Sequence, residues 1–286
     1  MRHLLAIRDL SADDLRAILA LSEARFTRAL QNKGVALYFE KPSARTRNSM
    51  EVAAAQLGGH PVYLQPNELG IGERESIGDI TRTLACYHAI IAARVFDHGL
   101  LEQMAALDAA PVLNMLSATD HPLQALADLL TIKQLLGHIE GARIAFVGEA
   151  NNVARSLAEG CVLLGAQFSI ASPVGFGFGR PMLAVNQLVD PLEAIDGADI
   201  VYSDVWVSMG DKDSRERREV FAPYQVSTDL MAQAPDAHFL HCLPARRGEE
   251  VSADVIDGPR SAVWRQAENR MHTARGAMLW LTGADA

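Results

Sequence analysis

Cysteine is scarce in this sequence. Its 286 residues include three cysteines, Cys86, Cys161 and Cys242, which lie far apart along the chain. An odd number of scattered cysteines does not form a disulfide framework, and none of the spacings is that of a zinc site. We therefore expect a reducing, cytoplasmic location and no bound metal.

Long apolar runs and surplus positive charge are also missing. No apolar run approaches the roughly 20 residues of a membrane-spanning helix, and the run within residues 1–10 is too short for a signal peptide. The formal net charge is −9, so the chain as a whole has no excess of cations to neutralise nucleic-acid phosphates. We expect neither a membrane nor a nucleic-acid partner.

Glycine-rich nucleotide loops are absent as well. A dinucleotide fingerprint needs three glycines after its first strand, but residues 147–156 contain Gly148 alone. The next predicted strand ends in Ala171-Ser172-Pro173, without the acidic residue that would bind a ribose. No Walker A sequence occurs. We therefore expect no cofactor.

The residues that are present indicate a globular chain of two domains. Hydrophobic residues make up 49% and charged residues 21% of the sequence, and its length exceeds that of one ordinary domain. Short, nearly continuous apolar runs, typical of strands buried on both faces, alternate with helical periods. The expected strands are residues 35–39, 61–65, 89–95 and 111–116, and then 143–148, 168–173, 198–205 and 238–244.

This alternation predicts an α/β fold with two domains, each a parallel sheet flanked by helices. We expect domains at residues 1–137 and 138–267, with a C-terminal helix at about 268–286 that packs back on the first domain. One connection is open. The glycine-rich residues 174–181 are few for a crossover to the apolar stretch 182–189. Either this crossover lacks a helix, or the stretch is not the next strand.

The segment FEKPSARTRNSM, Phe39–Met50, follows the first predicted strand and begins a helix. It brings Ser43 and Thr46 together with Arg45 and Arg47. Backbone N–H groups and the helix dipole favour an anion at such a position, and a guanidinium group fits phosphate in bidentate fashion. The pattern favours a phosphate-bearing small substrate; the alternative is an exposed helix start with solvated arginines.

Polar side chains also follow the other predicted strands, at the carboxyl ends where parallel sheets bind ligands. They are Arg94, His121, Gln124, Asn151, Asn152, and the runs DVWVSMG from Asp204 and HCLPARR from His241. Considered alone, His121 could be a structural histidine, and Asp204 could cap a helix or stabilise a turn. Cys242 fits an inert thiol, a polar contact to a substrate amine, or a nucleophile paired with His241 or His121. Their joint occurrence at strand ends favours a binding site.

Taken together, seven runs in this order resemble the ornithine carbamoyltransferase family: FEKPSARTRNSMEVA, AARVFDH, HPLQALAD, NNVARS, DVWVSMG, HCLPARRGEEV and AENRMHT. The resemblance covers nearly the whole chain. It implies transfer of a carbamoyl group from carbamoyl phosphate to the side-chain amine of ornithine, giving citrulline and phosphate, in arginine biosynthesis or the reverse direction. It also implies a carbamoyl phosphate domain followed by an ornithine domain, an active site in the cleft between them, and a homotrimer or a multiple of trimers.

The resemblance also assigns the site residues. The carbamoyl phosphate set is Ser43, Ala44, Arg45, Thr46, Arg94, His121, Gln124, Leu243 (through its carbonyl) and Arg270. The ornithine set is Asn152, Asp204, Ser208, Met209 and Cys242. The residues expected to take part in catalysis are Arg94, His121, Asp204 and Cys242.

Two positions depart from the family pattern. Ala44 stands where relatives have a threonine, and Gly70 where many have a glutamine that reaches a neighbouring subunit. Two alternatives to the ornithine reaction also stay open. They are a carbamoyltransferase for another amine such as putrescine, and a non-catalytic relative that binds metabolites.

Overall fold

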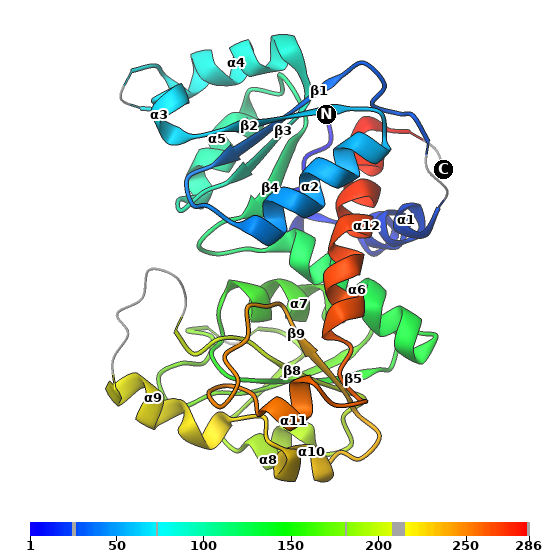
Figure 1. Cartoon of the computed structure of the whole chain (residues 1–286), viewed down its shortest axis with the longest axis vertical. Helices are drawn as coiled ribbons and strands as arrows, with labels where there is room; N and C mark the ends of the chain where they lie inside the picture. Colours follow the sequence, from blue (N-terminus) through cyan, green and yellow to red (C-terminus); the bar gives the residue numbers. More distant parts are fainter. Residues whose placement is uncertain (25–26, 73, 181, 208–214, 285–286) are drawn as a thin grey trace. The chain divides into compact units, whose positions relative to one another are not determined.

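The computed structural model of the chain describes residues 1–24, 27–72, 74–180, 182–207 and 215–284 (Figure 1). The chain forms two compact units: unit 1 is Met1–Ala127 with Arg270–Ala286, and unit 2 is Asp128–Asn269. It passes from one unit to the other within two helices, α6 (Pro122–Leu136) and α12 (Val263–Thr282). Helix α12 begins before the predicted start near residue 268, because the preceding turn buries Val263 in unit 2.

Among the described residues of unit 1, four parallel strands form one sheet in the order β2-β1-β3-β4. The strands are β1 (Gly34–Phe39), β2 (His60–Leu64), β3 (His88–Arg94) and β4 (Val112–Leu116). The helices that lie wholly in this unit are η1 (Ile7–Asp9), α1 (Ala12–Glu23), α2 (Ala44–Gln56), α3 (Pro66–Leu69), α4 (Ile77–Tyr87) and α5 (His98–Ala106).

Helices cover both faces of this first sheet. Alternate side chains of a strand face opposite sides, and Ala36 of β1 joins a buried cluster with Leu84 of α4 and Leu101 of α5. Figure 1 shows α2 and α12 on the other side of the sheet. Helix α12 also lies close to α1, since a Cβ at Gly276 would lie 2.2 Å from Ser22 Oγ. The sheet is therefore buried on both faces, as its continuous apolar strands indicate.

Among the described residues of unit 2, five parallel strands form one sheet in the order β7-β6-β5-β8-β9. The strands are β5 (Arg143–Val147), β6 (Gln167–Ala171), β7 (Val185–Leu188), β8 (Ile200–Ser203) and β9 (His238–His241). The helices wholly in this unit are α7 (Asn152–Leu163), α8 (Pro191–Ile195), α9 (Arg215–Phe221), η2 (Ala222–Tyr224), α10 (Thr228–Ala232) and α11 (Ala253–Ile256).

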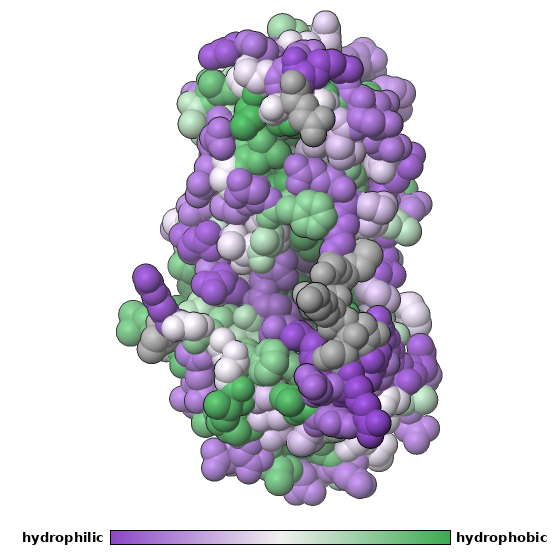
Figure 2. Space-filling view, turned by 90° about the vertical axis from the view of Figure 1, so that its left-hand side faces the viewer, coloured by the Kyte–Doolittle hydropathy of each residue, from purple (hydrophilic) through white to green (hydrophobic). Residues whose placement is uncertain are grey.

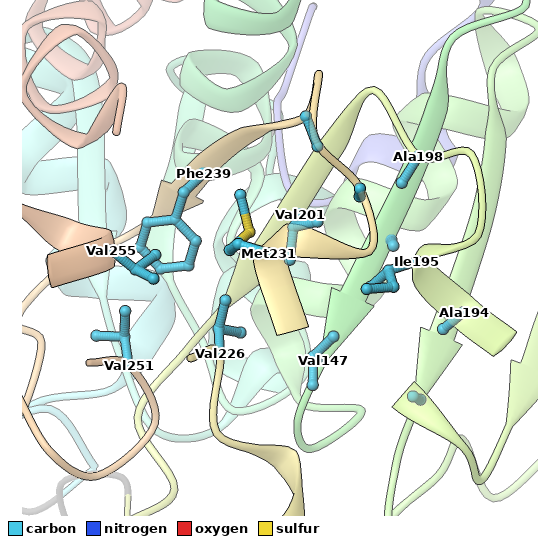
Figure 3. Close-up of a cluster of buried hydrophobic side chains, with 14 of the residues drawn as sticks. Val147, Ala194, Ile195, Ala198, Val201, Val226, Met231, Phe239, Val251 and Val255 are labelled. Atoms are coloured by element: carbon cyan, nitrogen blue, oxygen red, sulfur yellow. The ribbon is translucent and has the colours of Figure 1, made fainter. Parts of the chain in front are cut away.

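One face of the second sheet packs against its short helices. Val147 of β5 and Val201 of β8 meet Ile195 of α8, Met231 of α10 and Val255 of α11 in a buried cluster (Figure 3). Full burial of such a side chain stabilises the fold by roughly 1.5–3 kcal/mol. This packing fixes the strands whose carboxyl ends carry the predicted ornithine residues.

The α/β fold with two parallel sheets is confirmed, and the structure also decides the open connection. Strand β7 pairs with β6 in parallel, with Phe168 opposite Val185. The described residues between these strands, 172–180 and 182–184, contain no helix. The crossover therefore lacks a helix, and residues 185–188, inside the apolar stretch 182–189, are the next strand. Strand β7 lies at the edge of the sheet and pairs with β6 alone. A missing crossover helix there exposes less of the sheet than it would beside a central strand.

No described helix combines the length and the apolar character needed to cross a bilayer. The face drawn in Figure 2 carries hydrophilic residues over most of its area, with hydrophobic residues in separate groups. Scattered apolar residues of this kind are normal on folded domains.

Candidate active site

Helix α2 begins with a serine cap just beyond β1. Ser43 has an extended backbone, and its Oγ accepts a hydrogen bond from the Thr46 N–H at 3.4 Å. The Ser43 hydroxyl also lies 3.1 Å from Thr46 Oγ1, to which it donates. The N–H groups in the first turn of a helix, here including that of Ala44, lack intrahelical acceptors and favour an anion. The predicted residues Ser43, Ala44 and Thr46 thus lie in one helical turn.

Arg94 ends β3 directly beside Phe39, the last residue of β1. Its Nη1 donates to Thr46 Oγ1 at 3.1 Å, and its side chain is 7% exposed. Arg94 Nε has no hydrogen-bond partner among the described residues. Burial, and then the positive charge of Arg45, lower the pKa of Arg94 to about 10. A buried cation beside a second cation costs free energy until an anion joins them.

His121, at the start of α6, lies among the same cations. Burial, and then the charges of Arg270 and Arg94, lower the pKa of His121 well below 6.5. Its imidazole is therefore neutral near pH 7 and offers an N–H donor without a positive charge of its own. Arg270 Nη1 donates to Gln124 Oε1 at 3.1 Å, one turn along α6. The structure thus brings Arg94, His121, Gln124 and Arg270 together in unit 1.

The turn before His121 is held by a contact that the sequence did not reveal. Asp120 is fully buried and accepts two hydrogen bonds from Arg8, at 2.5 Å to Oδ1 and 3.1 Å to Oδ2. The Asp120 N–H donates to Ser117 Oγ at 3.2 Å, and the Ser117 N–H donates to the Asp120 carbonyl at 2.8 Å. A bidentate pair of this kind fixes both position and orientation. Arg8 lies in none of the sequence motifs. Only the fold shows that it holds Asp120, the residue before His121.

Asp204 follows β8 in unit 2, and its carboxylate is hydrogen-bonded on both oxygens. Oδ2 accepts from Asn151 Nδ2 at 2.8 Å. Oδ1 accepts from the Val205 N–H at 2.8 Å and from the Cys242 thiol at 3.0 Å. Asp204 is 8% exposed, so these donors replace most of its hydration. The carboxylate is held in one orientation at the end of the strand.

Cys242 follows β9, and its thiol lies among polar groups of unit 2. Burial, and then the charge of Asp204, raise the pKa of the Cys242 thiol well above its ordinary value. The thiol is therefore protonated near pH 7 and donates to Asp204, whereas a nucleophile would be a thiolate. Pairing with His241 is excluded by geometry, because His241 Nδ1 accepts from the Leu243 N–H at 2.8 Å and Nε2 lies 3.3 Å from Glu250 Oε1. In the structure the thiol makes a polar contact with Asp204, and its contact with a substrate amine stays a prediction.

The other predicted residues of the second half lie as follows. Leu243 comes directly after Cys242, with its N–H committed to His241. Asn152 is the first residue of α7 and is partly exposed. Ser208 and Met209 lie outside the described residues.

One group of described side chains has the donor set of a metal site. Asp204, His241 and Cys242 each offer one ligand atom, and these atoms lie within 4.8 Å of one another. Carboxylate, imidazole and thiol are ligands that Zn²⁺ takes. Both nitrogens of the buried His241 already face protein groups, and the thiol is bound to Asp204. We therefore interpret the group as a hydrogen-bonded part of the site.

Sequence reasoning placed both Asn151 and Asn152 at a strand end but assigned only Asn152 to ornithine. Asn151 caps α7, since its Oδ1 accepts from the N–H groups of Val153 and Ala154, both at 3.0 Å. Its Nδ2 is then free to point at Asp204. A cap position before a helix was the available signal, because it fixes one end of the amide and leaves the other end for a ligand or a neighbour.

Family models match both halves of the chain. The model described as "Aspartate/ornithine carbamoyltransferase, carbamoyl-P binding domain" matches residues 2–134. The model described as "Aspartate/ornithine carbamoyltransferase, Asp/Orn binding domain" matches residues 140–281.

Individual proteins are similar over nearly their whole length. An ornithine carbamoyltransferase of Hyperthermus butylicus is 46% identical, covering 97% of this chain and 96% of the relative. One of Bacillus subtilis is 43% identical, covering 97% of this chain and 92% of the relative. The solved structure of the Pyrococcus furiosus ornithine carbamoyltransferase is 41% identical and superposes with a TM-score of 0.93, covering 100% of this chain and 98% of that one.

Proposed function

This chain belongs to the aspartate/ornithine carbamoyltransferase family, and from that premise we propose that it is an ornithine carbamoyltransferase. It transfers the carbamoyl group of carbamoyl phosphate to the side-chain amine of L-ornithine, giving L-citrulline and phosphate. Relatives named for this activity align with nearly the whole chain. The proposal therefore concerns both half-sites and not one domain alone.

The observation that carries the proposal is the buried Arg94. Its pKa is lowered to about 10 in a place that holds another arginine and a helix N-terminus. A fall from 12.5 to about 10 corresponds to a cost of about 3 kcal/mol for keeping the cation there. A phosphate group recovers this cost, because it pairs with Arg94 and Arg45 and accepts from the first N–H groups of α2. Ser43 and Thr46 complete the set of donors.

The reaction needs a donor aimed at the carbamoyl oxygen. The amine nitrogen attacks the carbamoyl carbon, and negative charge gathers on the carbonyl oxygen of the tetrahedral species. Neutral His121, with Arg94 near it, stabilises this charge by an N–H donor. The bond from the carbon to the phosphate oxygen then breaks, and the phosphate leaves with the proton that the nitrogen gives up. Gln124 and Arg270 orient the carbamoyl group.

The second half-site supplies the acceptor. The side-chain amine of free ornithine has a pKa near that of lysine, about 10.4, so the reactive neutral form must be selected on binding. Asp204 is proposed to receive the amino-acid end of ornithine, together with Asn152, Ser208 and Met209. Cys242 lies at hydrogen-bond distance from Asp204 and, in the proposal, contacts the attacking amine. Leu243 offers its carbonyl to the carbamoyl NH₂.

The proposal extends to the placement of the site and to assembly. Residues 1–137 with the C-terminal helix would bind carbamoyl phosphate, and residues 138–267 would bind ornithine. A cytoplasmic homotrimer is part of the same proposal. Gly70 ends α3 at a φ of +60°, where a Cβ would lie 2.9 Å from Arg74 Cβ. This position therefore adds no side chain to a neighbouring subunit's site.

The test is citrulline formation from carbamoyl phosphate and ornithine, with putrescine and aspartate assayed in parallel. Turnover with ornithine alone is the expected result. Turnover with another amine would overturn the assignment of the acceptor while keeping the phosphate half. Binding of carbamoyl phosphate without any product would identify a metabolite-binding protein and overturn the catalytic proposal.

A further inference from the structure

A buried histidine stands directly before Cys242 and Leu243, and the proposed site gives it no role. His241 is the last residue of β9 and is 1% exposed. Its Nδ1 accepts a hydrogen bond from the Leu243 N–H at 2.8 Å. This bond closes a ring through the backbone of Cys242, so the imidazole restrains the peptide that joins Cys242 to Leu243. An accepting Nδ1 carries no proton, so the one N–H of the ring is at Nε2.

The backbone of His241 is itself fixed from two sides. In the second sheet, His241 pairs with Ser203 of β8. Its N–H donates to Oε1 of the buried Gln266 at 2.9 Å. Gln266 Nε2 donates in turn to Asp128 Oδ1 at 2.6 Å and to Tyr202 Oη at 3.1 Å. The imidazole therefore projects from a firmly held strand end into the loop that follows it.

The other ring nitrogen of His241 faces a carboxylate. Nε2 lies 3.3 Å from Glu250 Oε1, and both side chains are fully buried, although the contact lacks the alignment of a hydrogen bond. Glu250 Oε1 also accepts from the Arg246 N–H at 2.5 Å, so the same carboxylate holds the loop beyond Leu243. A carboxylate beside Nε2 favours the proton on that nitrogen and leaves Nδ1 as the acceptor.

Leu243 needs such a restraint, because its backbone lies in the left-handed region at a φ of +58°. A leucine side chain disfavours this region, and such conformations persist only where surrounding contacts impose them. From these contacts we infer that His241 is a positioning residue for Cys242 and Leu243. Its Nδ1 holds the Leu243 N–H, and this sets the direction of the Cys242 side chain and of the Leu243 carbonyl.

The consequence for the reaction rests on the proposed function. There the Leu243 carbonyl takes the carbamoyl NH₂, and Cys242 contacts the attacking amine. A misplacement of about 1 Å can cost on the order of 10²-fold in rate. Loss of the acceptor on His241 should therefore lower kcat for citrulline formation by about 10–100-fold.

Two substitutions separate the roles of the two ring nitrogens. In His241→Asn, the amide oxygen takes the place of Nδ1 and keeps the bond to Leu243, but no donor reaches Glu250. In His241→Gln, the longer amide faces Glu250 with its NH₂ and leaves the Leu243 N–H without its acceptor. The Asn variant should have the lower melting temperature, because a buried carboxylate loses its neighbour. The Gln variant should have the lower kcat, whereas for a merely structural histidine kcat would follow the melting temperature.

The direct measurement is hydrogen exchange at the Leu243 amide of the full chain, resolved by fragmentation mass spectrometry, and it needs no turnover. In the wild type this amide should exchange at least about tenfold more slowly than in a free peptide, although it lies beyond the last residue of β9. His241→Gln should speed its exchange by about tenfold, and His241→Asn by less than about threefold. The Gly148 amide, which donates to the Ala171 carbonyl at 2.9 Å, is the control for general loosening of unit 2.

The wild-type measurement stands even where a variant does not fold: a Leu243 amide that exchanges as in a free peptide would overturn the inference. Equal exchange in the two variants, or faster exchange in His241→Asn than in His241→Gln, would also overturn it. So would the expected exchange rates together with equal turnover in both variants. The expected exchange rates with no citrulline from the wild type would keep the restraint by His241 and overturn the proposed function.

Discussion

The two half-sites of this protein differ in the charge of their buried groups: cations in unit 1 and a carboxylate in unit 2. In unit 1, Arg94 is buried beside Arg45, and His121 is driven to its neutral form by Arg94 and Arg270. In unit 2, the carboxylate of Asp204 is satisfied by three donors of the protein. The first half thus gathers cationic and neutral donors in a buried place, and the second is an acceptor whose donors are already in place.

This difference shows which half depends on its ligand. Burial beside Arg45 makes the cation of Arg94 costly, and an anion offsets that cost, so unit 1 should bind phosphate strongly and gain stability from it. A carboxylate with a complete set of hydrogen bonds gains less from a ligand and acts mainly by its fixed direction. Unit 1 therefore supplies affinity, and unit 2 supplies selection of the acceptor.

The largest expected effect comes from removing the buried cation of unit 1. Arg94→Met should lower the affinity for carbamoyl phosphate by about 10²–10³, since a charged donor to phosphate is lost. The melting temperature should stay equal or rise, because about 3 kcal/mol of cost is relieved while one hydrogen bond to Thr46 is lost. Isothermal titration and thermal unfolding measure the two quantities.

The matched control for this variant lies on the same side of the molecule. Arg47 of α2 is exposed, pairs with Glu51 at 2.7 Å and stacks on Tyr63 at 4.0 Å. Arg47→Met should therefore leave phosphate affinity nearly unchanged. A large loss of stability in Arg94→Met with little loss of affinity would show that Arg94 is a structural residue, and the comparison of the two halves would fail.

A smaller effect is expected from the carboxylate of unit 2. Asp204→Asn keeps the shape of the side chain but removes its charge, and it should lower kcat/KM for ornithine by about 10², with carbamoyl phosphate affinity unchanged. Asp199→Asn is the control, because Asp199 lies before the other end of β8 and accepts from the Arg143 N–H at 2.8 Å. If Asp204→Asn weakened carbamoyl phosphate as strongly as ornithine, the division of roles between the halves would be wrong.

The sequence predicted the fold because strands buried on both faces are readable as short apolar runs. The predicted runs 35–39 and 143–148 correspond to β1 and β5 within a residue or so at each end. The crossover between β6 and β7 stayed ambiguous, since a connection without a helix violates the usual pattern of parallel sheets. The sequence cannot show whether the crossover lacks a helix or whether the stretch 182–189 is not the next strand. The parallel pairing of β7 with β6 decides between these two alternatives.

Site residues that stand in motifs could be predicted from the sequence. Residues that support the site through buried contacts could not. Ser43 and Asp204 follow strands and Arg94 ends one, so they could be found from that position alone. Arg8 and Gln266 could not, because each reaches a residue more than 60 positions away in the chain, Asp120 and Tyr202 respectively. Such contacts depend on how helices pack, and no local sequence pattern encodes them.

The smallest expected effect is the pH dependence that His121 imposes on stability. Its pKa is well below 6.5 in the folded protein, so below about pH 6.5 the unfolded chain binds a proton that the folded chain does not. Stability should fall with decreasing pH by up to about 1.4 kcal/mol per pH unit for this one proton. Urea unfolding between about pH 5 and pH 7 measures it, and His121→Gln should reduce the slope.

The same unfolding measurement, repeated with saturating phosphate, tests whether the anion binds beside His121 in unit 1. An anion bound beside Arg94 and Arg270 offsets the positive charges that oppose protonation of His121, so saturating phosphate should flatten the acid slope of the wild-type protein. His121→Gln should show no such flattening, because its slope no longer contains that proton. An acid slope that phosphate leaves unchanged in the wild type would mean that the anion binds away from His121, and the contrast between the two half-sites would then fail.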